Sequence, residues 1–132
     1  MRKIKFRGYN ERLKQWVYGF VKYGHNGKYS HWCIQETELN NDRDIWWYEQ
    51  LEVVEASIGQ YTGFKDRNGK EIYEGDIVID NFGLRQVVEY NEELGLWETY
   101  EIDDKTDRMD LYRYCSMCEV IGNVYEEKLK EK

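Results

Sequence analysis

Two pairs of metal-ligating residues are the first candidates for chemistry in this sequence. Cys115 and Cys118 form a Cys-x-x-Cys pair, and His31 lies two positions before Cys33. Thiolates and imidazoles are ligands of tetrahedral zinc, so the two pairs together could form a zinc site. The residues around Cys115 look extended, however, and side chains three positions apart on a strand point to opposite faces. We therefore favour thiols that pack as small hydrophobic side chains. No predicted helix N-terminus would lower a thiol pKa for redox chemistry.

Acidic pairs are the second candidates, because hydrolases often use two carboxylates as acid and base. Asp76 lies four positions before Asp80, and Glu71 lies three positions before Glu74. The chain has 26 acidic residues, so such pairs arise by chance, and Asp76 beside Gly75 is typical of a turn. We expect no catalytic residues, no cofactor and no enzymatic activity. A small hydrolase or a zinc protein stays an alternative.

The third candidate combines basic and aromatic side chains near the N-terminus. Lys3, Lys5 and Arg7 alternate along a predicted strand, so they share one face. Trp16 and Tyr18 are among the rings that could stack the bases of a single-stranded nucleic acid beside these cations. The ordinary interpretation of so short a basic run is a solvated strand face. The same five residues could instead contact a protein partner.

The overall charge and the apolar runs limit the possible partners and location. The formal charge is −7, whereas duplex binding normally requires clustered basic residues, so non-specific duplex DNA is disfavoured as a ligand. No apolar run approaches the ~20 residues that span a bilayer, and the N-terminus lacks the apolar core of a signal peptide. We expect a cytoplasmic protein without a membrane partner. Its three cysteines should be reduced, because their number is odd.

Strands are the main elements that would position these residues. A length of 132 residues fits one domain, and the aromatic content of 16% suits half-buried sheet faces. Alternating and aromatic runs predict a three-stranded meander in the N-terminal part. Its strands cover residues 4–9, 15–21 and 29–34, with turns at 10–12 and 24–27.

Cross-strand charges choose between two turns in the segment DRNGK. A two-residue Asn68-Gly69 turn would place Arg67 opposite Lys70, which is a destabilising like-charge pair. A three-residue loop with Gly69 in the left-handed conformation instead places Asp66 opposite Lys70. We therefore predict the three-residue loop, and backbone geometry alone accounts for its glycine.

The C-terminal part is also predicted to be mostly strand, with Ile77–Ile79 central to the core and bounded by a turn at Asn81-Phe82-Gly83. Asn123 can cap a short terminal helix with Glu126 three positions on. The polar run 36–44 predicts a loop, and residues 45–48 fit either strand or helix. The other predicted elements are strands at 84–90 and 94–102, a strand-like run from 111 through 122 and a charged surface loop at 103–107.

Residues 57–78, SIGQYTGFKDRNGKEIYEGDIV, resemble the signature of the YopX family of phage and prophage proteins. IKFR at 4–7 with VYG at 17–19 resembles the family's start, and EVIGNVYE at 119–126 resembles its close. These three blocks span nearly the whole chain. The sequence departs from the pattern in the stretches 24–50 and 100–118, and where Glu127-Lys128 stands in place of Asn-Pro.

The resemblance implies an all-β, mostly antiparallel fold of small interlocked SH3-like barrels, in a single YopX-like domain over residues 1–132. It implies no established activity, so no functional residues carry over. We predict a non-catalytic phage or prophage accessory domain in the bacterial cytoplasm that contacts a viral or host protein. A single-stranded nucleic-acid-binding module is the alternative. Open sheet edges often pair, so a homo-oligomer is a further expectation.

Overall fold

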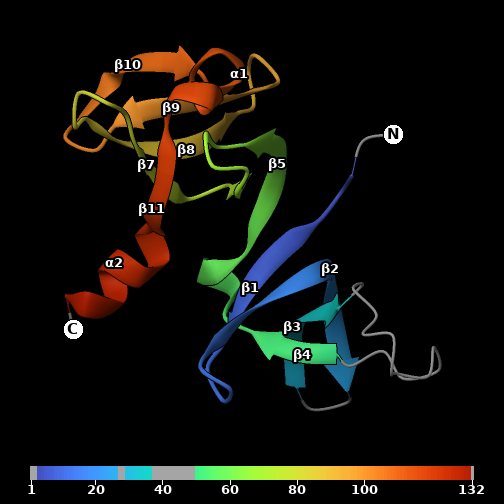
Figure 1. Cartoon of the computed structure of the whole chain (residues 1–132). Coiled ribbons are helices and arrows are strands. Elements are labelled where there is room, and N and C mark those ends of the chain that lie inside the picture. The colour runs from blue at the N-terminus through green and yellow to red at the C-terminus, as the bar shows by residue number, and fades with distance from the viewer. Residues whose placement is uncertain (1–2, 27–28, 37–49, 132) are drawn as a thin grey trace. The chain divides into compact units, whose positions relative to one another are not determined.

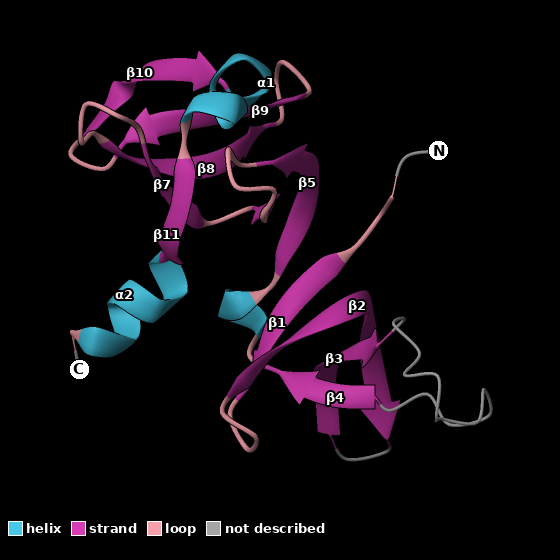
Figure 2. Cartoon of the chain, viewed as in Figure 1, coloured by secondary structure: helices cyan, strands magenta, loops and turns pink. Residues whose placement is uncertain are grey.

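The structure is a computed structural model that describes residues 3–26, 29–36 and 50–131. The chain divides into two compact units, residues 1–60 (unit 1) and residues 61–132 (unit 2). Antiparallel strands dominate each unit, and a short helix closes the chain, so the predicted fold class is confirmed (Figure 2). The single domain over residues 1–132 stays a prediction. The predicted loop at 37–44 and the aromatic run at 45–48 lie outside the described residues.

Unit 1 is built on an antiparallel meander whose strands follow one another in the sheet (Figure 1). The predicted hairpin is confirmed by the register Phe6↔Gly19 to Asn10↔Gln15, but its turn covers residues 11–14 rather than the predicted 10–12. The turn predicted to start at Gly24 is wrong in its boundary, because the second strand continues through Asn26. The elements of unit 1 are β1 (Phe6–Asn10), β2 (Gln15–Asn26), β3 (Tyr29–Glu36), β4 (Gln50–Val53), the 3-10 turn η1 (Glu55–Ser57) and the start of β5 (Gly59–Lys65).

The core of unit 1 is formed by alternate side chains of the meander. Val17, Ile34, Leu51 and Val53 come from β2, β3 and β4 and are buried together. The sheet bends until β4 returns to β1, where the Val54 amide donates to the Tyr9 carbonyl at 3.0 Å. This return resembles the closing step of a small barrel, and the SH3-like barrel itself stays a prediction.

Unit 2 contains a five-stranded antiparallel sheet in the order β10-β9-β8-β7-β11. The predicted central strand is confirmed, because β7 pairs on both sides and Ile77 and Val78 are buried. The remainder of β5 pairs with β6, and both precede this sheet in the chain. Besides the remainder of β5, the elements of unit 2 are β6 (Glu71–Tyr73), β7 (Asp76–Ile79), β8 (Arg85–Asn91), β9 (Leu96–Glu101), β10 (Asp104–Asp110), α1 (Leu111–Tyr114), η2 (Cys115–Met117), β11 (Glu119–Asn123) and α2 (Val124–Lys130).

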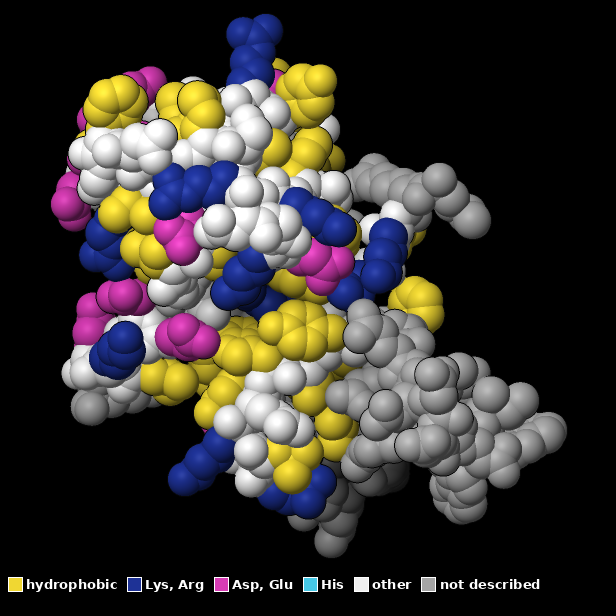
Figure 3. Space-filling model, in the orientation of Figure 1, with side chains coloured by type: hydrophobic (Ala, Val, Ile, Leu, Met, Phe, Trp, Pro, Cys, Tyr) yellow, Lys and Arg dark blue, Asp and Glu magenta, His cyan; other side chains and the backbone are white. Residues whose placement is uncertain are grey.

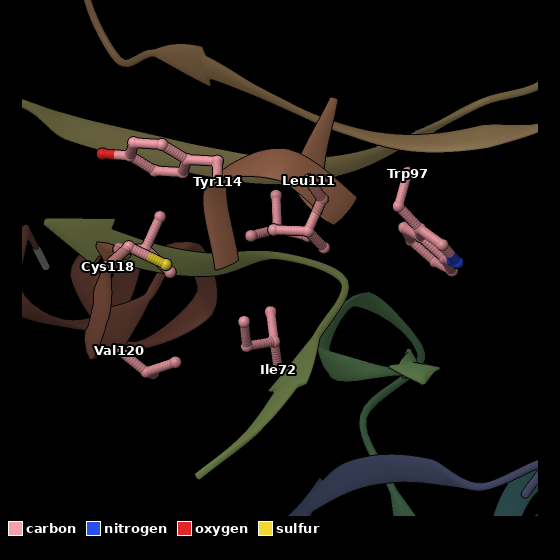
Figure 4. Close-up of a cluster of buried hydrophobic side chains, with 8 residues drawn as sticks. Ile72, Trp97, Leu111, Tyr114, Cys118 and Val120 are labelled. Carbon is pink, nitrogen blue, oxygen red and sulfur yellow. The ribbon is translucent and has the colours of Figure 1, made fainter. Parts of the chain in front are cut away.

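The core of unit 2 joins its sheet to the helical turn that follows β10. Leu111 of α1 and Ile72 of β6 are fully buried and face each other, as Figure 4 shows. Cys118 and Val120 belong to the same cluster. The helical turn therefore covers one side of the sheet with apolar side chains.

Two predictions about the region after β9 are wrong. Residues 104–107, which were expected in a charged surface loop, belong to strand β10, which pairs with β9 through an irregular register. Residues 111–114 were expected as a strand but form α1, because Asp110 accepts a hydrogen bond from the Tyr112 amide and caps the helix. The terminal helix is confirmed, since the Asn123 side chain accepts from the Glu126 amide as predicted.

Candidate interaction surface

Four of the five residues of the predicted basic and aromatic face come together on β1, β2 and the residue that precedes β1. Arg7 pairs with Tyr18 in the register, and its guanidinium carbon lies 4.8 Å from the centre of the Trp16 ring. The Lys5 ammonium lies 5.9 Å from the centre of the Tyr18 ring. These contacts form two neighbouring cation–π pairs.

Two of the three basic side chains on this face are buried. Lys5 is 4% exposed and Arg7 is 7% exposed, so the expectation of a solvated basic face is wrong for both residues. Their charged ends lie against rings rather than in water, whereas Lys3 is exposed. The nucleic-acid hypothesis stays a prediction, and of the three cations only Lys3 offers it an exposed charge.

The cysteines lie in a different setting from the one we predicted. Cys115 and Cys118 flank a helical turn rather than a strand, and the Cys118 thiol lies 3.4 Å from the Cys115 carbonyl oxygen that accepts its hydrogen bond. Burial is the main cause that raises the pKa of Cys118 to about 12, and the negative charge of Asp66 is the next largest. Cys33 is buried, and the side chain of His31 lies outside those described. The part of the chain that the structure describes contains no cluster of three metal-ligating groups.

The acidic pairs serve the turns around them. Asp76 is buried and accepts a hydrogen bond from the Tyr73 amide at 2.7 Å, which fixes the turn before β7. Glu71 accepts a hydrogen bond from the Tyr73 hydroxyl at 3.2 Å. Asp80 binds two amides of the next turn. The described contacts of these three carboxylates are therefore contacts of folding.

A pocket of about 500 Å³ lies in unit 1 between the turn after β1 and the end of β4. Its lining mixes charged side chains with the backbone and apolar side chains of β4, and it holds no pair of nucleophile and base. The lining residues are Asn10, Glu11, Arg12, Leu51, Glu52, Val53 and Val54.

The turn between β7 and β8 holds an aromatic side chain in solvent. Phe82 is 90% exposed. The Asp80 carboxylate accepts hydrogen bonds from the Phe82 amide at 2.9 Å and the Leu84 amide at 3.1 Å, and Gly83 takes the left-handed conformation with φ +80°. Burial alone would raise the pKa of Asp80, but the hydrogen bonds outweigh it and lower the pKa. The ionised carboxylate therefore fixes the turn that presents the phenyl ring.

Two further exposed apolar side chains lie in segments that are joined to this turn. Leu84 lies at its end, and Met117 comes two residues before Glu119, which pairs with Ile79 just before the turn. The Arg67 guanidinium connects the two segments, because it donates to Asn81 at 2.6 Å and to Glu119 at 2.8 Å. We call Phe82, Leu84 and Met117 the apolar tip. Figure 3 shows hydrophobic side chains reaching the surface among charged ones on one face of the molecule.

The sequence predicted the turn at Asn81 to Gly83 but not the apolar tip. A phenylalanine between asparagine and glycine is a signal of an exposed ring, since such a turn leaves no neighbouring strand to cover it. Met117 carried no comparable signal, because its segment was predicted as a strand.

A polar network on the sheet of unit 2 neutralises a like-charge pair. Glu89 and Glu98 lie directly opposite each other on β8 and β9. The Arg108 guanidinium donates to Glu98 at 2.8 Å and to Glu89 at 3.1 Å. The pKa of Glu98 is lowered mainly by the hydrogen bond from Arg108, and the hydrogen bond from Asn91 is the second largest cause.

Replacing Arg108 with methionine should reduce the free energy of unfolding by about 1–2 kcal/mol at neutral pH, because Glu89 and Glu98 would then repel each other. Glu98 has a lowered folded pKa, so its contribution is present above the unfolded pKa and is lost as pH falls through the folded value. The difference in unfolding free energy between wild type and variant should therefore shrink in acid, which urea unfolding at two pH values would measure.

Arg85→Met is the matched control, since its pair with Glu127 is exposed on both sides and should contribute less than about 0.5 kcal/mol. An equal loss in both variants would contradict this account.

Comparisons with known proteins place nearly the whole chain in one family. A family model described as YopX protein matches residues 5–129. A crystal structure of protein EF1440 from Enterococcus faecalis is similar over 100% of both chains, with 22% identity and a TM-score of 0.49. No curated protein matches the chain. Among the described residues, no helix has the length and apolar character needed to cross a membrane.

Proposed function

Because the chain belongs to the YopX family, we propose that it is a non-catalytic phage or prophage accessory protein that docks on a viral or host protein in the bacterial cytoplasm. The apolar tip of unit 2 is the docking surface. The folding contacts of the three carboxylates described above and of the Cys118 thiol support the non-catalytic part of the proposal.

The exposure of Phe82 is the observation that carries this proposal. Leaving a phenyl ring in water forgoes roughly 1.5–3 kcal/mol of burial free energy, which a partner could recover. Asp80 and Gly83 hold the turn in one conformation, so little conformational entropy would be lost on binding. Rigid aromatic anchors of this kind often dominate protein interfaces.

Leu94 provides a matched control for Phe82. It is 65% exposed and lies in the turn between β8 and β9, at the other end of β8. The Asn91 side chain accepts from the Leu94 amide at 3.1 Å, and Gly95 takes φ +67°, so this turn also has a polar side chain that binds its amides and a left-handed glycine. Leu94 is therefore an exposed apolar side chain in an ordered turn at the opposite end of the sheet from Phe82.

A photo-crosslinking amino acid placed at position 82 should form a protein adduct in host bacteria that express the protein during phage growth. The same amino acid at position 94 should not form that adduct. Mass spectrometry of the adduct identifies the partner. The proposal fails if position 82 gives no adduct, if both positions give the same adduct, or if the adduct contains only a second copy of this chain or nucleic acid.

The folding control uses Phe82→Ser and Leu94→Ser. Both side chains are exposed, so each variant should unfold within about 0.5 kcal/mol of wild type. Phe82→Ser should abolish the adduct formed by a crosslinker at position 84, and Leu94→Ser should leave it unchanged.

A further inference from the structure

The turn between β9 and β10 lies beside the apolar tip. In an antiparallel order β7-β8-β9-β10, the first and third connections fall at the same end of the sheet, and the second falls at the other. A direct contact agrees with this placement, because the Ile102 amide donates to the Arg85 carbonyl at 3.2 Å, one residue after Leu84. Side chains of the third connection therefore flank the tip.

This neighbouring turn is acidic. Glu101, Asp103 and Asp104 are exposed, and we call them the acidic turn. Asp104 accepts hydrogen bonds from the Thr106 hydroxyl at 2.6 Å and the Thr106 amide at 3.0 Å, which lower its pKa and keep it ionised. In the described part of the chain, no lysine or arginine forms an ion pair with these three carboxylates.

The acidic turn belongs to the acidic unit of the chain. Residues 61–132 contain 18 acidic and 10 basic side chains, which gives a formal charge of −8. Residues 1–60 contain 8 acidic and 9 basic side chains, which gives +1, and the two values sum to the −7 of the whole chain. The apolar tip is thus presented by a unit whose field repels anions. Anionic lipid, nucleic acid and acidic protein surfaces would all approach it against that field.

From the tip and the acidic turn together, we infer that the partner is a protein surface with an apolar socket for Phe82, flanked by lysine or arginine side chains. The inference rests on the proposed function and specifies the partner's chemistry. Burial of the ring supplies binding energy, while opposite charges around it steer the approach and set the orientation. Partners with acidic rims are excluded by like-charge repulsion.

The test is an NMR titration of the 15N-labelled full chain with two synthetic peptides at low salt. The peptides share one apolar core containing leucine and tryptophan, and they differ only in flanking lysines or flanking glutamates. The lysine peptide should shift the amides of Phe82 to Leu84 and of Glu101 to Asp104. The glutamate peptide should bind at least roughly tenfold more weakly.

Charge reversal at two turns provides the matched control. Glu101→Lys with Asp103→Lys should weaken binding of the lysine peptide by roughly tenfold, whereas Glu92→Lys with Glu93→Lys, at the opposite end of the sheet, should change it less than twofold. Equal effects of the two double variants would overturn the inference. So would shifts centred on the turn at residues 92–95, equal binding of both peptides, absence of binding, or a stronger response of the tip to single-stranded DNA.

The two proposals fail separately. A protein adduct at position 82 without a preference for the lysine peptide removes the basic socket and leaves the docking surface intact. A preference for the lysine peptide without any adduct in bacteria removes the proposed function while the surface chemistry stands.

Discussion

Replacing Asp66 with alanine should lower the free energy of unfolding by about 3 kcal/mol or more. Asp66 is 6% exposed, and its carboxylate accepts three backbone hydrogen bonds, from Asn68, Lys70 and Val120, each at 2.9 Å. Removal of the carboxylate leaves the buried Val120 amide without its acceptor, which costs roughly 1–3 kcal/mol, and the two partly buried turn hydrogen bonds are lost at roughly 0.5–1.5 kcal/mol each. The substitution would loosen the connection between two elements, because the first two amides belong to the hairpin turn and the third belongs to β11.

Equilibrium unfolding in urea, followed by tryptophan fluorescence, would measure this loss. Asp107→Ala is the matched control, because Asp107 is an exposed aspartate of the same unit and should change stability by less than about 0.5 kcal/mol. A loss below about 1 kcal/mol for Asp66→Ala would show that water replaces the carboxylate, and the account of the hairpin would then be wrong.

Acid should remove the same stabilisation from the wild-type protein. Burial alone would raise the pKa of Asp66, but the backbone donors outweigh it and hold the pKa below the ordinary carboxyl value of about 4. A lowered folded pKa means that the contribution is complete above the unfolded value and is lost as pH falls through the folded value. The wild type and Asp66→Ala should therefore differ fully at pH 7 and converge as pH falls below the ordinary carboxyl value and through the lowered pKa of Asp66.

The role of Asp66 also shows how much of the fold could be predicted from the sequence. The charges of Asp66, Arg67 and Lys70 favoured the three-residue loop, and the structure has it, with the Asp66 amide donating to the Lys70 carbonyl at 2.8 Å and Gly69 at φ +82°. Such local turns are predictable because neighbouring residues decide them. The bond from Val120 to Asp66 was not predictable, since it joins residues 54 positions apart.

The errors arose where tertiary packing outweighed local pattern. The run 111–114 is too short for its apolar pattern to decide between strand and helix, and burial of Leu111 and Tyr114, three positions apart, in the same core cluster fits one helical turn. Lys5 and Arg7 gave the expected alternation but not the expected exposure, because exposure depends on what lies over a strand. The apolar tip was missed for a related reason: the turn around Phe82 indicated an exposed ring, but only the fold shows that Leu84 and Met117, from separate segments, are exposed as well.

Replacing Gly8 with alanine should strongly destabilise unit 1. A β-carbon at Gly8 would lie 2.8 Å from the Val53 Cβ and Cγ1 atoms and 2.9 Å from Cγ2. Rotation of the Val53 side chain cannot relieve the contact, because Cβ itself is too close, so β4 would have to move away from β1. That movement strains the Val54 to Tyr9 hydrogen bond, and we expect a loss of about 3 kcal/mol in thermal or urea unfolding.

A control glycine and a compensating substitution separate this clash from other effects of alanine. A β-carbon at Gly122 on β11 would lie 4.0 Å from its nearest neighbour, the Glu126 Oε2 atom, so Gly122→Ala should be neutral or slightly stabilising. Val53→Gly removes the clashing atoms, so Gly8→Ala combined with Val53→Gly should be at least about 1 kcal/mol more stable than the sum of the single losses predicts. Additive losses would mean that β1 and β4 do not meet at these two residues, because only a shared contact can couple them.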